Sequence, residues 1–184
     1  MILETPAEHP FAVYVRILGK GKRGARDLTR EEAREAMGML LDGKVEEAQL
    51  GAFLMLLRHK EESAEELAGF TEAVRERVQA PKTAVDLDWP SYAGKKRHLP
   101  WYLLAARCLA ANGVRIVMHG GGAHTAGRIY TEQQLQLLGI RRCDDWAEVG
   151  AALDENRLAF IPLGAWMPVL QRMIDMRNLL GLRS

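Results

Sequence analysis

Apolar residues recur at helical spacing through the first eighty positions of the chain. Thr29-Arg-Glu-Glu32 and Ser63-Ala-Glu-Glu66 are capping boxes, and apolar residues three and four positions apart follow each of them. The strongly apolar stretch 45–60 lies between these two helices. Residues 11–18 indicate a short opening helix, although their alternation is also compatible with a strand. The pattern therefore predicts a bundle of about four helices, closed by Pro81.

After Pro81, short apolar runs alternate with helical segments. We expect strands at 83–87, 114–118 and 158–162. We expect a loop at 89–98 and helices at 100–112, 131–138, 146–156 and 165–180. Because strands that alternate with helices form parallel sheets with crossover helices, the fold class is α/β. The sequence predicts a helical bundle at 1–80 and, at 81–184, the first part of a parallel-sheet α/β domain that looks truncated and leaves a sheet edge open.

Composition places the chain among ordinary globular proteins, with 48% apolar and 27% charged residues. No apolar run approaches the length of about 18 residues that a membrane span needs, and the start lacks a signal-peptide pattern. Cys108 and Cys143 are far apart and lack metal-ligand spacing, so we expect reduced thiols in a cytoplasmic protein. Three methionines are expected to fill the core: Met37, Met39 and Met55.

The net charge is only +1, but basic residues gather in two segments. A charge run is most often a solvated face, yet these segments bracket the helical domain. Trp89, Tyr92 and Trp101 lie near the second segment, and lysine or arginine with interleaved aromatic residues suits phosphates and stacked bases. The candidate phosphate- or nucleic-acid-binding residues are Lys20, Lys22, Arg23, Arg26, Lys95, Lys96 and Arg97.

Several segments in order along the chain resemble the anthranilate phosphoribosyltransferase family, the class III phosphoribosyltransferases of glycosyl transferase family 3. They include Gln49-Leu-Gly-Ala-Phe-Leu54, Leu57-Arg-His-Lys60 and the stretches 112–120 and 176–183. The segments 19–28, 90–94, 118–120 and 161–165 are similar to the YbiB-like branch of that family. Because family members are much longer, the chain resembles an N-terminal portion.

The resemblance implies a site that has lost its chemistry. The enzymes hold pyrophosphate with a glycine-rich turn after the first strand, where this chain has Trp89-Pro-Ser-Tyr-Ala-Gly94. A second motif, Lys-His-Gly-Asn-Arg, corresponds to Met118-His-Gly-Gly-Gly122, and the acidic pair for magnesium would lie beyond Ser184. What remains is a vestigial pocket: Ser91, Gly94, His119, Gly120 and Arg177. Each has a plain structural reading: His119 as a loop histidine bonded to backbone, the glycines as a flexible turn, and Arg177 as a partner of Asp175.

Two functions follow from these observations. The first is a nucleic-acid-binding protein on a phosphoribosyltransferase-like scaffold, as the YbiB-like branch implies. It would have no catalytic residue, cofactor or metal, would bind DNA or RNA largely independently of sequence, and would form a homodimer through the helical domain. The alternative is a glycosyl or phosphoribosyl transferase with a divergent pyrophosphate site and Mg²⁺ as cofactor. A third possibility is a dimerising helical module alone.

Overall fold

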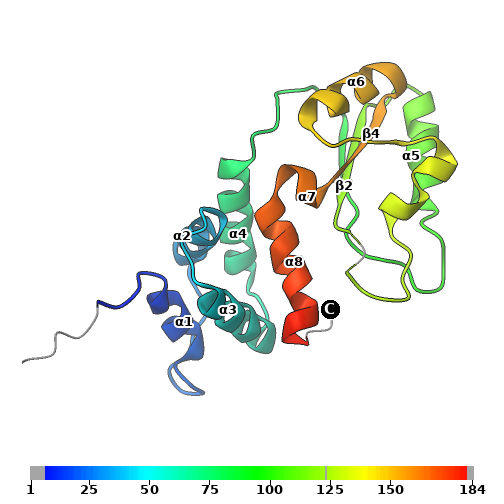
Figure 1. Ribbon diagram of the computed structural model, residues 1–184. Coiled ribbons are helices and arrows are strands. Elements are labelled where there is room, and N and C mark those ends of the chain that lie inside the picture. Colours follow the sequence, from blue (N-terminus) through cyan, green and yellow to red (C-terminus); the bar gives the residue numbers. More distant parts are fainter. Residues whose placement is uncertain (1–6, 123, 182–184) are drawn as a thin grey trace, which may run out of the picture. The chain divides into compact units, whose positions relative to one another are not determined.

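The computed structural model describes residues 7–122 and 124–181. By its internal contacts the chain divides after Val78 into two compact units (Figure 1). One is helical, and the other contains all the strands of the described residues. The division lies beside the predicted boundary at residues 80 and 81.

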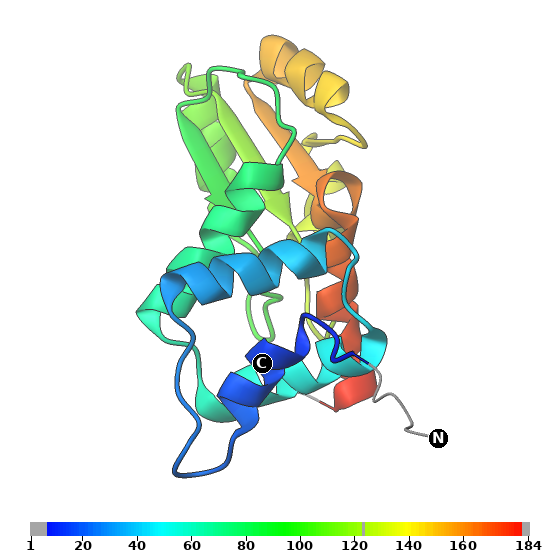
Figure 2. The same cartoon turned by 90° about the vertical axis from the view of Figure 1, so that its left-hand side faces the viewer.

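The helical unit contains the four helices that the hydrophobic pattern predicted. They are α1 (Ala12–Gly19), α2 (Arg30–Leu41), α3 (Glu47–Lys60) and α4 (Ala64–Arg77). Helix α2 packs on α4 and α1 packs on α3, and Figure 2 shows α2 lying across α4. The ring of Phe53 is fully buried, with ring centroids 5.3 Å from Phe11 and 6.2 Å from Phe70. Residues 11–18 are thus helical rather than extended, because Phe11 and Leu18 bury on one side of α1.

Both predicted capping boxes are confirmed. At the start of α2, the Glu32 amide donates to Thr29 Oγ1 at 3.2 Å and the Thr29 amide donates to the Glu32 carboxylate at 2.9 Å. At the start of α4, Ser63 and Glu66 form the same reciprocal pair at 3.2 and 2.7 Å. Each box satisfies two backbone amides near a helix start, one of them an orphan of the first turn.

The second unit is built on a parallel sheet, as predicted. In the described residues its strands are β1 (Leu87–Pro90), β2 (Ile116–Gly120), β3 (Arg141–Arg142) and β4 (Leu158–Pro162), in the order β1-β2-β4-β3. The helical elements are α5 (Tyr102–Ala111), the 3₁₀ turns η1 (Thr131–Gln134) and η2 (Gln136–Leu138), α6 (Trp146–Asn156), α7 (Leu163–Trp166) and α8 (Pro168–Leu180).

Side chains alternate between two cores on opposite faces of the sheet. Met118 packs with Leu103 of α5 in the first core, and Val117 packs with Leu153 of α6 in the second. The strands between them, β2 and β4, are buried almost throughout, as central strands of a covered parallel sheet are. This alternation fixes which side chains of β2 face which layer.

Some predicted boundaries are wrong. The first strand begins at Leu87 rather than ending there, since Asp86 is held outside it by the Arg115 amide at 2.7 Å. The predicted loop 89–98 therefore starts inside β1, whose edge position tolerates Pro90. The segment 131–138 forms two 3₁₀ turns rather than one helix: Leu135 is buried and Leu138 partly buried, but Leu137 is exposed, and the left-handed Gly139 ends the segment.

Two further expectations are corrected. Helix 165–180 is divided at Met167, because Pro168 disfavours helical backbone in the residue before it. Strand β3 was not predicted, since Arg141 and Arg142 carry no apolar signal and pair with the buried β4. Met37 is buried as expected, but Met55 is 41% exposed and does not fill the core.

Candidate functional site

The carboxyl ends of β1, β2 and β4 meet at one edge of the sheet, where open parallel sheets bind their ligands. Ser91 follows β1, Gly121 and Gly122 follow β2, and Leu163 follows β4. Most of the predicted vestigial pocket, Ser91, His119 and Gly120, therefore comes together at this edge. Arg177 is half-buried on α8, and the Asp175 carboxylate accepts from Gln171 at 2.9 Å.

His119 is held by two side chains rather than by backbone. Its Nδ1 lies 2.7 Å from the Tyr92 hydroxyl and its Nε2 lies 2.9 Å from Asp88 Oδ1. Trp166 meets the imidazole edge-on, with centroids 5.7 Å apart. Burial lowers the pKa of His119, and the neighbouring Asp88 offsets this only in part. The neutral ring thus accepts from Tyr92 and donates to Asp88, so both of its nitrogens are used within the protein.

Tyr92 also lies beside Gly121, the first glycine after β2. A Cβ on Gly121 would lie 3.5 Å from Tyr92 Cδ1, and the Gly122 amide donates to Gln171 Oε1 at 3.4 Å. Burial and the Asp88 carboxylate raise the pKa of Tyr92 to about 12, so its hydroxyl stays protonated. Gly121 therefore lies against an aromatic ring, and the Gly122 amide is hydrogen-bonded to a side chain.

Ser91 belongs to a cluster of three hydroxyls. Its Oγ lies 2.7 Å from the Tyr102 hydroxyl, and Thr131 is hydrogen-bonded to both groups. The Ser91 amide donates to the His119 carbonyl at 2.7 Å. The Ser91 carbonyl lies against Gly120 and leaves no room there for a Cβ. Ser91 and Gly120 thus join β1 to β2 and present no open group to a ligand.

The second basic segment, residues 95–97, begins at an isolated antiparallel β-bridge between Lys95 and Ile129. The backbone of Lys95 exchanges hydrogen bonds with Ile129 at 2.7 and 2.8 Å, and its ammonium lies 5.6 Å from the centroid of the Tyr102 ring. Gly94 is required here, because a Cβ would lie 2.6 Å from the Tyr130 ring. Lys96 and Arg97 are exposed and form no ion pair with any other described residue. The segment thus presents two uncommitted cations.

The first basic segment lies in the helical unit. Lys20, Lys22 and Arg23 are exposed there and pair with no acid among the described residues. Arg26 differs, because its guanidinium forms two bonds to the Glu32 carboxylate at 2.6 and 2.7 Å and one to the Asp27 carbonyl at 2.8 Å. Its charge is therefore used in an ion pair within the protein, which the sequence alone did not indicate.

Comparison with known proteins shows which proteins share this architecture. Residues 15–78 match the helical bundle domain of the glycosyl transferase family. The chain is 33% identical over 174 residues to YbiB of Escherichia coli (strain K12), covering 92% of this chain and 54% of YbiB. It is 37% identical over 166 residues to anthranilate phosphoribosyltransferase of Methylobacterium radiotolerans, covering 88% of this chain and 47% of that protein. The crystal structure of anthranilate phosphoribosyltransferase from Thermus thermophilus matches 96% of this chain and 52% of its own, with a TM-score of 0.76 at 25% identity.

The chain is thus similar to anthranilate phosphoribosyltransferases and to YbiB over most of its own length. It spans about half the length of the curated relatives it matches and corresponds to their N-terminal portion. The predicted resemblance to YbiB is confirmed, and so is the fold of a helical bundle followed by a small parallel sheet. This similarity indicates a transferase-like scaffold.

The described residues do not supply a set of ligands for the metal ion that the family resemblance implies. Within 7–122 and 124–181, no three His, Cys, Asp or Glu side chains come together in an arrangement that suits a metal ion. No helix in the same ranges is long and apolar enough to cross a membrane.

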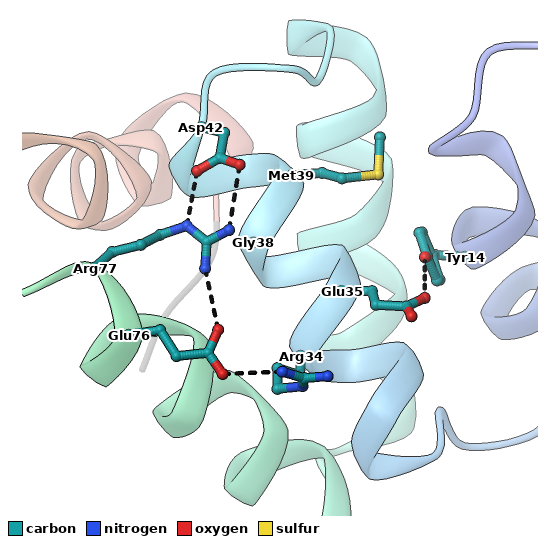
Figure 3. Close-up of a pocket in the computed structure, with 8 residues that line it drawn as sticks. All are labelled: Tyr14, Arg34, Glu35, Gly38, Met39, Asp42, Glu76 and Arg77. Carbon is teal, nitrogen blue, oxygen red and sulfur yellow. Dashed lines mark hydrogen bonds and ion pairs between the residues drawn. The ribbon is translucent and has the colours of Figure 1, made fainter.

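A cavity of about 380 Å³ in the helical unit is the other site to consider (Figure 3). Its charges are mutually paired: Arg77 binds Asp42 at 2.7 Å, Arg34 binds Glu76 at 2.9 Å, and Tyr14 donates to Glu35 at 3.0 Å. Burial, together with the Glu35 carboxylate, raises the pKa of Tyr14 to about 12. Because its polar groups satisfy one another, this cavity offers a charged ligand little to bind.

Proposed function

We propose that this chain binds nucleic acid on an anthranilate-phosphoribosyltransferase-like scaffold, without the parent activity. Exposed cations would neutralise backbone phosphates, largely independently of sequence, in the cytoplasm. Two groups of residues would supply them: Lys20, Lys22 and Arg23 in the helical unit, and Lys95, Lys96 and Arg97 in the α/β unit. Arg26 would act by holding its loop rather than by contacting phosphate.

The observation that carries this proposal is the exposure of Lys96 and Arg97 without an acidic partner among the described residues. Other cations of the described chain are used in ion pairs, as Arg30 is with Glu72 and Arg142 with Glu132. Unpaired surface cations are available for phosphates, and each phosphate contact releases condensed counterions. Steep salt dependence is therefore the expected signature.

The occupied sheet edge supports the loss of the parent activity. The ring of Tyr92 lies against His119 and Gly121, in the segment that the family resemblance assigns to pyrophosphate. A pyrophosphate cradle needs open backbone amides, but in this turn Pro90 has no amide hydrogen and the Ser91 amide donates to the His119 carbonyl at 2.7 Å. Binding at this edge would first require Tyr92 to leave its hydrogen bond with His119.

The test is a fluorescence titration of labelled DNA at low and moderate salt with Lys96→Glu and Arg97→Glu. Each substitution should weaken binding for all sequences and lower the slope of log affinity against log salt by about 1. Lys82→Glu makes the same charge change at an exposed residue outside both segments and serves as the control. Affinity unchanged between the two salt concentrations, or equal losses in all three variants, would refute the proposal.

A homodimer formed through the helical domain would double the phosphate contacts and so compensate for the low net charge. Sedimentation equilibrium of the free protein measures this directly, and a monomer at binding concentrations would rule out this part of the proposal.

The alternative is a glycosyl or phosphoribosyl transferase with a divergent pyrophosphate site. The similarity to anthranilate phosphoribosyltransferases across most of this chain favours it. Calorimetry with phosphoribosyl pyrophosphate, with and without Mg²⁺, separates the two functions. Tight magnesium-dependent binding without affinity for DNA would replace the proposal by this alternative.

A further inference from the structure

An apolar groove of about 120 Å³ lies on the α/β unit between the start of α5 and the turn η2. Trp101 and Leu104 line it from α5 and its cap, and Leu137 lines it from η2. These side chains are 61%, 49% and 79% exposed. The groove is thus lined by large apolar side chains that are in contact with water.

Helix α5 is apolar on two faces, and only one of them is needed by the core. Leu103, Ala106 and Ala110 are buried against the sheet. Trp101 and Leu104, one helical turn apart, form the other face. The packing of the described residues therefore does not use the ring of Trp101, which is 61% exposed.

The surroundings of the groove are basic. From Trp89 to Thr131 the chain contains no aspartate or glutamate. Lys96 and Arg97 lie four or five residues before Trp101, and Arg107 lies one turn after Leu104 on the exposed side of α5. Arg97 and Trp101 are at most about 14 Å apart along the backbone. An apolar surface in a basic field suits a partner that is both flat and anionic.

The aromatic residues near this basic segment differ in how far their rings are exposed to solvent. Trp89 stacks on Tyr102 at 5.9 Å, and Tyr92 is hydrogen-bonded to His119. Of these, only Trp101 presents most of its surface to solvent. Since stacking on a base needs an open ring face, Trp101 is the residue able to supply it.

We infer that this groove binds unpaired bases of a single-stranded nucleic acid, with Trp101 stacking on a base and Lys96 and Arg97 contacting the adjoining phosphates. This inference rests on the proposed function and narrows its ligand. Bases in a duplex are already stacked on one another, so Trp101 reaches them only in a single strand. The chain should therefore bind single strands more tightly than duplexes of the same length.

The test uses the whole chain with labelled oligothymidine and a duplex of equal length, at one low salt concentration. Trp101→Ala should weaken single-strand binding roughly 5- to 150-fold, the range for loss of one stacked base. Duplex binding should change little. Trp101→Phe keeps an aromatic ring and should retain most of the affinity. Leu179→Ala removes an apolar side chain that is 81% exposed and does not line the groove, and should have no effect.

A second readout reports stacking itself. Oligothymidine should quench tryptophan fluorescence in the parent chain, and this quenching should fall sharply in Trp101→Phe. Circular dichroism melting confirms that each variant is folded, as expected for a side chain that is 61% exposed.

The outcomes separate this inference from the proposed function. If both nucleic acids bind in a salt-sensitive way and Trp101→Ala has no effect on either affinity, the inference is overturned and the proposed function stands. The same holds if Trp101→Ala lowers the affinity for single strands and for duplexes equally. No binding of either nucleic acid would remove the proposed function. Altered self-association of Trp101→Ala in sedimentation, with unchanged single-strand affinity, would make the groove an interface between copies of this chain and overturn the inference.

Discussion

At the scale of single residues, Glu66 shows how much one buried carboxylate organises. The sequence predicts its role in the capping box with Ser63, but its side chain is 0% exposed and also accepts from the Leu28 amide at 2.9 Å and from Lys60 at 2.7 Å. Burial by itself would raise the pKa of Glu66, yet Lys60 and the two amides outweigh burial and lower it. A buried charge is stable here because every donor around it is in place.

We therefore expect Glu66→Gln to destabilise the chain by about 2 kcal/mol at pH 7, since it leaves donors without a charged acceptor. The sign of the pH dependence follows from the lowered pKa: the contribution is present above the ordinary value of 4.5 and is lost as pH falls through the lower folded-state pKa. Urea unfolding should give a difference between parent and variant that shrinks below pH 4.5. Glu65→Gln, at the exposed neighbour, is the control, and a pH-independent difference would contradict the assignment.

At the scale of elements, the loop between α1 and α2 combines exposed cations with fixed ends. Asp27 binds Lys60 at 2.7 Å and Arg26 binds Glu32 on α2. Lys20, Lys22 and Arg23 lie between these anchors and the end of α1. The loop thus presents its cations from a frame set by neighbouring helices.

The contribution of the ion pair between Arg26 and Glu32 can be measured through the pKa of Glu32. Hydrogen bonds from Arg26 outweigh the effect of burial and lower the pKa of Glu32 to about 2. Arg26→Ala should raise the pKa of Glu32 towards its ordinary value of 4.5, as measured by carbon-detected NMR titration of the side-chain carboxyl. Lys22→Ala, in the same loop, should leave the Glu32 titration unchanged. If the pKa of Glu32 stayed near 2 without Arg26, the loop would be held by other contacts.

At the scale of the whole molecule, each unit contains its own core. The helical unit centres on Phe11, Phe53 and Phe70, and its capping boxes are internal to it. The α/β unit has the two cores that flank β2 and β4. Each unit thus has the internal contacts that independent folding requires.

We expect residues 1–78 to fold without the rest of the chain, although a domain of this size is only marginally stable. Far-ultraviolet circular dichroism should show a helical fragment with a cooperative thermal transition, and Phe53→Ala should abolish that transition because it empties the centre of the aromatic cluster. A fragment without helical signal at low temperature would show that its core depends on residues beyond Val78.

The sequence predicted the segments whose signal is local. Helices α2 and α4 follow from their capping boxes and apolar spacing, and the parallel sheet follows from alternating strands and helices. Boundaries that depend on distant partners were wrong. Strand β1 is set by its pairing with β2, and the charged pair Arg141-Arg142 is extended only because β4 lies beside it.

The sequence by itself determined most of the helices, the parallel sheet, the family resemblance and the presence of two basic segments, because period, capping and composition are carried by neighbouring residues. Only the tertiary structure decided which residues of those segments are available to bind a ligand. Arg26 and Arg23 are equivalent in sequence, but one is paired with Glu32. Trp89 and Trp101 are likewise equivalent until Trp89 stacks on Tyr102 and Trp101 remains exposed. Burial and ion pairing depend on residues brought together from distant positions, so no local pattern encodes them.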